Sequence, residues 1–485
     1  MRCDWRGKLL SSARCLRLFQ RAFAAGLAFV ASACVQGPNY SRPAVEVPSS
    51  YRFSQTQVFS NPGLREGWWR ELRDPRLDSM VSEALSNNRD LAVATARVDE
   101  FAAILQGTKA QAYPQIGYDL SGTRSRASEE KIPAFANPLS TSFSALLSAS
   151  WEIDLWGRIR RETEASRANL LATEEARRGV ILTLVSSVVS SYVTLLDLDE
   201  RLRIAQATLE GRRRWVELFR ARLSKGYISD FEMAQAEAEY EATAAAIPNL
   251  KQAIATQEDA LSVLLGRNPG GIIRDRTLDS IQFPAIPAGL PSELLTQRPD
   301  ILQAEQQLVA SNALIGAARA LYFPRVSLTG IAGFASSALK SLFTGPAHSW
   351  TFTGDVAGPI FTGGGIVAAN RQAEARRDQS LALYQKSIQD AFRDVDDSLA
   401  DIQNSYEIQQ SLSRQVQSLE EGVRLATLRY DNGYTDYINV LDTERGLYNA
   451  QLSLTEARGD RYRAVVSLYR ALGGDWLQTP PARSQ

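Results

Sequence analysis

The chain has 485 residues, with 54 Lys and Arg, 54 Asp and Glu, one His and three Cys. Its 44% hydrophobic and 22% charged content is that of a folded protein. Because His348 is the only imidazole, histidine-based catalysis or metal binding has little to draw on, and no P-loop, HExxH or CxxC motif occurs. The composition argues against an enzyme.

Residues 1–33 differ from the rest in charge and hydropathy. Six basic residues and one acidic residue lie there, with the short apolar run Ala22–Val30 and the small residues Ala31–Ala33 after the basic stretch. The run is too short for a membrane-spanning helix, which needs about 20 residues. We therefore predict a secretory signal peptide over 1–33. The remaining chain is net negative, which disfavours nucleic-acid binding.

Cysteine usage refines this prediction, because Cys3 and Cys15 leave with the signal and Cys34 becomes the first mature residue. Ala31-Ser32-Ala33-Cys34 resembles the lipobox of bacterial lipoproteins, whose Cys carries a diacylglycerol and an N-acyl chain. In that class, Val35 at the next position implies the outer membrane as the destination. The resemblance predicts a palmitate-type lipid anchor on Cys34, and we expect no cofactor or metal.

The mature chain shows an internal duplication, the feature that most strongly limits the choice of fold. A shift of 207 aligns 222–266 with 429–473, and a shift of 210 aligns 90–116 with 300–326. The identical pairs include Arg222/Arg429, Gly226/Gly433, Tyr227/Tyr434, Glu237/Glu444, Asp90/Asp300, Ala103/Ala313 and Pro114/Pro324. Two blocks in the same order indicate two copies of one unit.

Each copy predicts the same succession of elements. A helix over about 75–112, or 292–321, ends before Pro114 or Pro324. Alternating strands follow around 116–120 and 143–153, and around 326–330 and 350–356. A helix of nearly 70 residues, about 100 Å long, then runs to Gly226 or Gly433. A second helix returns over 230–265 or 437–472, so each glycine suits a helix C-cap.

Residues 179–196 carry no charge, so a transmembrane helix there is an alternative. Apolar residues recur at spacings of three and four, and serines fall largely on another face, which favours packing inside a helical assembly. Four strands cannot close a barrel, since the smallest outer-membrane barrels have about 8. We therefore expect other copies of the chain to complete the sheet.

Several motifs lie along the mature chain: Gly37-Pro38-Asn39-Tyr40-Ser41-Arg42-Pro43, Trp151–Arg158, Arg429–Tyr434 with Asp436-Tyr437, and Leu472–Trp476. Together they resemble the outer-membrane factors, the TolC-like ducts of tripartite efflux systems, and most of all their lipidated branch serving resistance-nodulation-division pumps. The resemblance implies an α+β membrane protein: a trimeric 12-stranded outer-membrane β-barrel, four strands per chain, continued by a long periplasmic α-helical barrel.

In function, the resemblance implies a passive multidrug or small-molecule exit duct that works with a periplasmic adaptor and an inner-membrane resistance-nodulation-division pump. A type I secretion duct for proteins is the alternative, and a structural coiled-coil lipoprotein is a weaker one. The expected location is the outer membrane, lipid-anchored and extending into the periplasm. We divide the chain into the signal at 1–33, an N-terminal arm at 34–74, repeats at 75–266 and 292–473, an equatorial linker at 267–291 and a tail at 474–485.

The resemblance also assigns site residues by position. Ile438, Asp442 and Arg445 correspond to the inner constriction of the periplasmic gate, and Asp442 and Arg445 share a helix face. Tyr430 corresponds to a tyrosine that links neighbouring helices, with Glu232 as its expected partner. The adaptor-docking tips are assigned to Gly226, Tyr227, Gly433 and Tyr434. The acidic cluster Asp394, Asp396, Asp397 and Asp401 was considered for a divalent ion, but a solvated helix face is the favoured interpretation.

Overall fold

The structure is a computed structural model that describes residues 35–53, 67–131, 137–283 and 291–474. The signal segment and Cys34 lie outside the described residues, as does most of the C-terminal tail. Two successions of helix, two strands and a long helical hairpin follow one another, as the duplication predicts. The first comprises α2 (Pro75–Asn87), α3 (Arg89–Ala110), β1 (Gln115–Arg126), β2 (Leu139–Ile153), α4 (Arg158–Leu223) and α5 (Asp230–Leu264). The second comprises α6 (Pro291–Gln297), α7 (Pro299–Ala320), β3 (Arg325–Ser336), β4 (His348–Ala357), α8 (Gly365–Asp431) and α9 (Tyr437–Ala471).

The first helix of each copy is interrupted, so the prediction of continuous helices over 75–112 and 292–321 is wrong at one residue in each. Asn88 ends α2 with extended dihedrals, and its side-chain oxygen accepts a hydrogen bond from Leu91 N at 3.0 Å. An asparagine in this geometry caps the next helix rather than continuing the first. In the second copy the break falls at Arg298, where the following Pro299 disfavours helical dihedrals.

The four strands form one antiparallel sheet in the order β1-β2-β3-β4. The register places Ile116 opposite Ala149, Trp151 opposite Leu328, and Gly330 opposite Phe352. Since side chains alternate between faces, one face gathers apolar residues and the other is mostly polar. The apolar face includes Ile116, Tyr118, Leu120, Ala145, Leu147, Trp151, Val326, Leu328, Trp350, Phe352 and Val356. The outer edges of β1 and β4 have no partner strand among the described residues.

The two long helices confirm the predicted length, with 66 residues in α4 and 67 in α8. Among the described residues, α4 is the one helix long and apolar enough to cross a membrane, but half of its apolar window is buried inside the protein. Val188, Val189, Val193 and Leu195 in that window are fully buried. This burial supports packing within a helical assembly rather than exposure to lipid.

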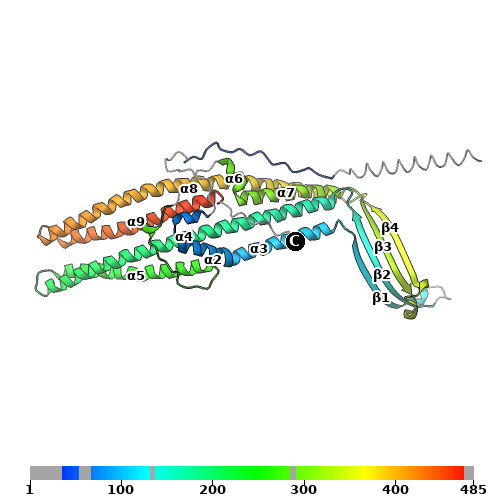
Figure 1. Ribbon diagram of the computed structural model, residues 1–485, viewed down its shortest axis with the longest axis horizontal. Helices are drawn as coiled ribbons and strands as arrows, with labels where there is room; N and C mark the ends of the chain where they lie inside the picture. Colours follow the sequence, from blue (N-terminus) through cyan, green and yellow to red (C-terminus); the bar gives the residue numbers. More distant parts are fainter. Residues whose placement is uncertain (1–34, 54–66, 132–136, 284–290, 475–485) are drawn as a thin grey trace, which may run out of the picture. The chain divides into compact units, whose positions relative to one another are not determined.

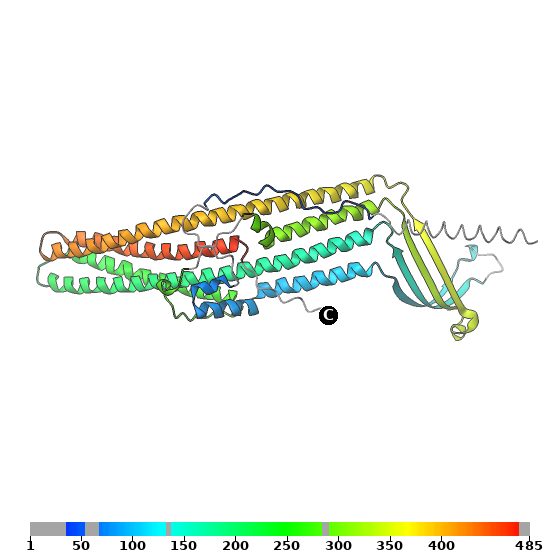
Figure 2. The ribbon, with the colours of Figure 1, turned by 45° about the horizontal axis from the view of Figure 1, so that its top comes forward.

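The chain divides into two compact units, each drawing on both repeats. One contains Val98–Ala172 and Ala304–Tyr384 with the segment ending at Pro43, and therefore holds the sheet, α7 and the first part of α4. The other contains Ala44–Arg97, Thr173–Gln303 and the chain from Gln385, and therefore holds α5, α9 and the larger parts of α4 and α8. Figure 1 shows the four strands of the first unit side by side. In the second unit α5 runs beside α4, and α9 beside α8, in both Figure 1 and Figure 2.

Candidate functional site: the helical tips and the network behind them

The turn between α4 and α5 is a glycine-terminated helix end. Gly226 has a φ of 72°, its N–H donates to Leu223 O at 2.9 Å, and Tyr227 N donates to Arg222 O at 3.0 Å. This pair of bonds is a Schellman-type C-cap, which requires a left-handed residue and therefore favours glycine. Ser229 then begins α5 with a capping box, in which its N–H donates to the Glu232 carboxylate at 2.9 Å.

The turn between α8 and α9 repeats this geometry. Gly433 has a φ of 73°, its N–H donates to Tyr430 O at 2.9 Å, and Tyr434 N donates to Arg429 O at 2.8 Å. The tyrosine after each glycine is strongly exposed, at 77% for Tyr227 and 76% for Tyr434. The predicted docking tips are thus two equivalent turns that each present an aromatic ring to solvent.

An aromatic core lies directly behind the tips and joins the two hairpins. The Phe219 and Tyr437 rings meet edge to face with centroids 4.5 Å apart, and Trp215 packs against both. Its buried members come from three helices, α4, α5 and α9: Val216, Phe219, Met233, Ala236, Tyr437, Val440 and Leu441. The fourth helix, α8, contributes the partly buried Ala426 and Tyr430. Such edge-to-face pairs add about 0.5–1.5 kcal/mol each beyond burial of area. The core therefore holds α4, α5, α8 and α9 together close to their turns.

Tyr430 takes a partner other than the predicted Glu232. Its hydroxyl accepts a hydrogen bond from Arg222 Nη1 at 3.1 Å, whereas Glu232 is engaged in the capping box of its own helix. Burial raises the pKa of Tyr430, and the nearby Arg222 opposes that rise. Within the chain Tyr430 thus links α8 to α4, so it does connect neighbouring helices, but through an arginine.

Arg445 is the centre of the predicted gate constellation. Its Nη1 donates to Asp442 Oδ1 at 3.3 Å on the same helix, and its Nε donates to Glu239 Oε1 of α5 at 2.7 Å. The bond to Glu239 is the main reason that the pKa of Arg445 is raised. Ile438 lies one turn before Asp442 and is partly exposed. Ile438, Asp442 and Arg445 thus lie near one another on the first turns of α9.

The structure adds charged residues that the sequence did not single out for this site. The Arg212 guanidinium lies 2.8 Å from Glu239 Oε2, and both side chains are largely buried. Trp215 Nε1 donates to Glu444 Oε1 at 3.0 Å, and burial raises the pKa of the Glu444 carboxyl. Glu444 carried a faint signal as one of the identical repeat pairs. Glu239 and Arg212 carried none, because their partners lie on other helices.

A family model described as "Outer membrane efflux protein" matches residues 80–267 and 290–474. The chain belongs to this family. It is 37% identical over 453 residues to the cation efflux system protein CusC of Escherichia coli, covering 92% of this chain and 98% of that one. It is 34% identical over 465 residues to the probable efflux pump outer membrane protein TtgC of Pseudomonas putida, covering 94% and 96%.

Solved structures of outer-membrane channels have the same fold. The outer-membrane channel OprN superposes on this outer membrane efflux protein with a TM-score of 0.85 at 30% identity, covering 91% of this chain and 100% of that one. Both the family and the function predicted from the motifs are confirmed: the protein is an outer membrane efflux channel, not an enzyme.

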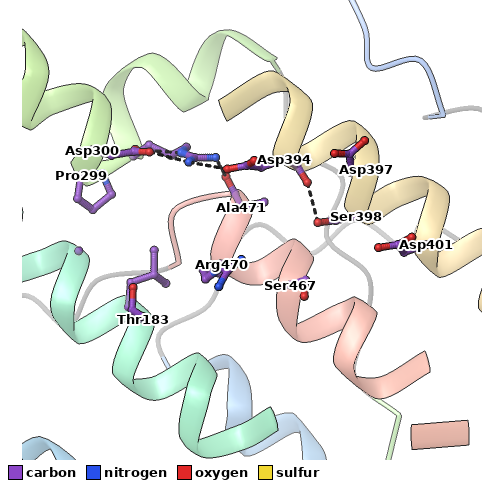
Figure 3. A pocket seen from close by; sticks show the side chains of 13 residues that line it. Thr183, Pro299, Asp300, Asp394, Asp397, Ser398, Asp401, Ser467, Arg470 and Ala471 are labelled. Carbon is purple, nitrogen blue, oxygen red and sulfur yellow. Dashed lines mark hydrogen bonds and ion pairs between the residues drawn. The ribbon is translucent and has the colours of Figure 1, made fainter. Parts of the chain in front are cut away.

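The acidic cluster on α8 lies beside the break between α6 and α7, which we call the second joint. A cavity of about 410 Å³ lies between α4, α8, α9 and the α6–α7 break, and Figure 3 shows Asp394, Asp397 and Asp401 spaced along α8 at its side. The buried Arg298 reaches across, with Nη2 2.6 Å from Asp300 Oδ2 and 3.1 Å from Asp394 Oδ2, and Nη1 donating to Ala471 O at 3.0 Å.

This joint does not favour a metal ion. Asp394 is neutralised by Arg298, and Asp396 accepts from Arg52 N at 3.0 Å. Within the described ranges no group of three or more His, Cys, Asp or Glu is arranged to hold a metal. In the first repeat the matching position is Asn88, which donates to Leu264 O at 3.0 Å. The two repeats thus join their helices by different chemistry, one neutral and one charged.

Proposed function

We propose that this protein is the exit duct of a tripartite efflux system, built as a homotrimer whose sheets combine into a 12-stranded outer-membrane β-barrel. The observation that carries the proposal is the pair of open edges on a sheet with one apolar face. In a bilayer each unpaired backbone group costs several kcal/mol, so β1 of one copy must pair with β4 of the next. Three copies of four strands close a barrel of a size within the known range.

The exposed apolar side chains of the sheet support a lipid-facing surface. Ile116, Tyr118 and Phe352 are each 78% exposed within the single chain, and they lie on the same face of the sheet. The opposite face carries Ser148, Glu152, Thr329 and Asp355, which suit a water-filled lumen. Alternation of apolar and polar residues is the pattern of an outer-membrane barrel strand.

The helical hairpins then form the periplasmic part of the duct, with its gate at the tips. In a trimer, three copies of Asp442 make a carboxylate ring that narrows the opening and attracts cations. Arg445 braces this ring by holding Asp442 and Glu239 together across two helices. Ile438 and Tyr430 complete the proposed gate, with Glu232 next to it in the first turn of α5.

The names of the relatives and the exposed helical tips support two partner proteins. CusC and TtgC are named for efflux systems and pumps, which supports a periplasmic adaptor and an inner-membrane resistance-nodulation-division pump as partners here. The adaptor docks at Gly226, Tyr227, Gly433 and Tyr434, where exposed rings sit on backbone turns with open space around them. Relatives are named for cargoes as different as cations and toluene, and we propose that the pump selects the cargo.

Lipidation of Cys34 completes the proposal and places the anchor in the outer membrane. Its support is the Ala31-Ser32-Ala33-Cys34 motif that follows a signal-like segment. A lipidated terminus tethers the protein without spanning the bilayer. Mass spectrometry of the purified mature protein is expected to show a diacylglycerol and an N-acyl chain on Cys34, and a free cysteine or an earlier cleavage would contradict it.

The decisive experiment is planar-bilayer conductance of the purified mature protein. We expect a small wild-type conductance that rises severalfold in Asp442→Ala/Arg445→Ala. The matched control is Glu421→Ala/Arg424→Ala, which removes an exposed ion pair with the same spacing on α8 and should leave the conductance unchanged. An equal rise in the control would place the gate elsewhere. No conductance in any variant, from folded protein, would refute the duct and favour a structural lipoprotein.

A further inference from the structure

The segment after Cys34 lies in a groove of the first unit whose walls are α4 and α7. Gln36 N donates to Trp156 O at 3.2 Å, next to the start of α4. Val35 packs against Gly157, where an added Cβ would come within 2.9 Å of the valine side chain. The segment therefore packs closely against the start of α4. The two helices that flank it, α4 and α7, come from different repeats.

Three consecutive carbonyls of this segment are bound by side chains of the groove. Arg161 donates from Nε to Gln36 O at 3.0 Å and from Nη2 to Gly37 O at 3.2 Å. Asn312 Nδ2 donates to Pro38 O at 3.0 Å. The Arg161 side chain is only 5% exposed, and Asn312 is also buried. Buried donors aimed at successive carbonyls recognise the peptide backbone itself, as in peptide-binding sites.

The groove also discriminates between side chains. Arg161 Nη2 donates to Asn39 Oδ1 at 2.9 Å, while Tyr40 Oη donates to Glu305 Oε1 at 3.0 Å. The other oxygen of that buried carboxylate pairs with Arg42 Nη2 at 2.6 Å. Both of these donors to the Glu305 carboxylate thus come from the segment itself. Without the segment, the buried Glu305 carboxylate would lose its ion pair with Arg42, and an unpaired buried charge is strongly destabilising.

Two glycines make the fit specific. Gly37 has a φ of 88°, and a Cβ there would overlap the backbone of Gly316. A Cβ on Gly316 would in turn overlap the carbonyl of Gln36. Alanine at either position is therefore excluded by contact, and at Gly37 also by backbone strain. The motif Gly37-Pro38-Asn39-Tyr40-Ser41-Arg42 marks the family in the sequence, and the groove gives nearly every one of its residues a physical role.

We propose that this groove, formed by Gly157, Arg161, Glu305, Asn312 and Gly316, is a peptide-recognition site whose ligand is the chain's own mature N-terminus. The bound segment clasps α4 to α7 and so ties the two repeats together beside the sheet. It also fixes the start of the mature chain at the junction of β2 and α4. Binding of the segment stabilises the first unit, and it does not depend on whether the helical tips act as a gate.

The test uses the full mature chain with Cys34→Ser, so that no acyl chain can hold a fragment in detergent. A site for a specific protease is placed within 54–66, the chain is cut, and retention of the N-terminal fragment is followed by size exclusion and mass spectrometry. We expect the fragment to remain bound to the unaltered groove. Glu305→Gln should speed its release at least about tenfold, because it removes a charged hydrogen-bond acceptor. Glu374→Gln, which loses an exposed ion pair between α8 and Arg319 of α7, is the matched control.

A second measurement does not depend on the folding of any variant. A labelled peptide with the sequence of residues 35–43 is added to the cut protein, and exchange with the bound fragment is measured. The native peptide should exchange, whereas a peptide with Gly37→Ala should not. Equal exchange by both peptides, or equal retention in Glu305→Gln and the unaltered chain, would overturn the proposal.

Discussion

The contact between Glu239 and its two arginines offers the sharpest test of how the hairpins are held together. The perturbation is Glu239→Gln, which keeps the size and shape of the side chain but removes its charge. The Glu239 side chain is 12% exposed and that of Arg212 only 6%. Arg445 and Asp442, by contrast, are 45% and 63% exposed. The two halves of this network therefore experience different solvent screening.

The expected magnitudes follow from that difference. Breaking a buried ion pair from one side costs about 3–5 kcal/mol, because the remaining charge stays buried. Arg212 would keep its bond to Glu239 O at 2.6 Å and its position 5.7 Å from the Tyr448 ring centroid. We therefore expect Glu239→Gln to cost about 2–4 kcal/mol. Asp442→Asn, which breaks an exposed pair, should cost about 0–1 kcal/mol.

The assay is thermal unfolding of the detergent-solubilised protein, followed by circular dichroism at matched protein concentration. A double-mutant cycle between Glu239→Gln and Arg445→Ala then isolates the contact across the helices. We expect a clear coupling in that cycle and a weak one for Asp442→Asn with Arg445→Ala. If Asp442→Asn destabilised the protein as much as Glu239→Gln, the argument from burial would be refuted.

Three further predictions concern other parts of the second unit. Burial raises the pKa of Glu444 above its ordinary value of 4.5, so the folded state holds this proton more tightly than the unfolded state, and stability falls as the pH rises from 4.5 through the raised pKa. Glu444→Gln should therefore raise the unfolding temperature at neutral pH, and this gain should vanish below pH 4.5. A gain independent of pH would contradict the prediction. An alanine side chain at Gly226 or Gly433 would have open space around it, but the backbone there has a positive φ, so each substitution should cost about 1 kcal/mol of local stability. A bulky residue at either position should abolish complementation of efflux while trimers still form on native gels. Loss of the trimers would mean that these glycines are purely structural. Arg298→Ala should lower the unfolding temperature more than Asn88→Ala, since it removes a buried cation that contacts Asp300, Asp394 and the carbonyls of Ala391 and Ala471. Equal shifts would mean that the charge at the second joint, the break between α6 and α7, adds no stability.

Local sequence patterns determined much of the fold. Alternation within short segments predicted all four strands, because a strand with one apolar face needs only its own period of two. The scarcity of helix breakers predicted two helices of nearly 70 residues, and Gly226 and Gly433 predicted their ends, since few other residues adopt positive φ at a C-cap. The break at Asn88 was missed because asparagine inside a helical pattern shows its capping role only when its dihedrals are known.

Motif resemblance placed Ile438, Asp442, Arg445 and Tyr430 near the tips, and these residues do lie there. The sequence could not supply their partners. Glu239 and Arg445 are 206 residues apart, and Arg161 meets Gly37 across 124 residues. Which side chains meet across a helical interface depends on the rotation of each helix about its axis, and that is set by the packing of whole helices.

The sequence by itself thus determined the elements through the period of nearby residues and the duplication through its self-alignment. It determined the family and the efflux function through the resemblance of its motifs. Only the tertiary structure decided that Tyr430 binds Arg222, that Glu239 bridges two arginines, and that the segment from Gln36 to Arg42 is bound by side chains of both α4 and α7. These are contacts between distant segments, and their energies depend on burial and geometry that no local pattern records.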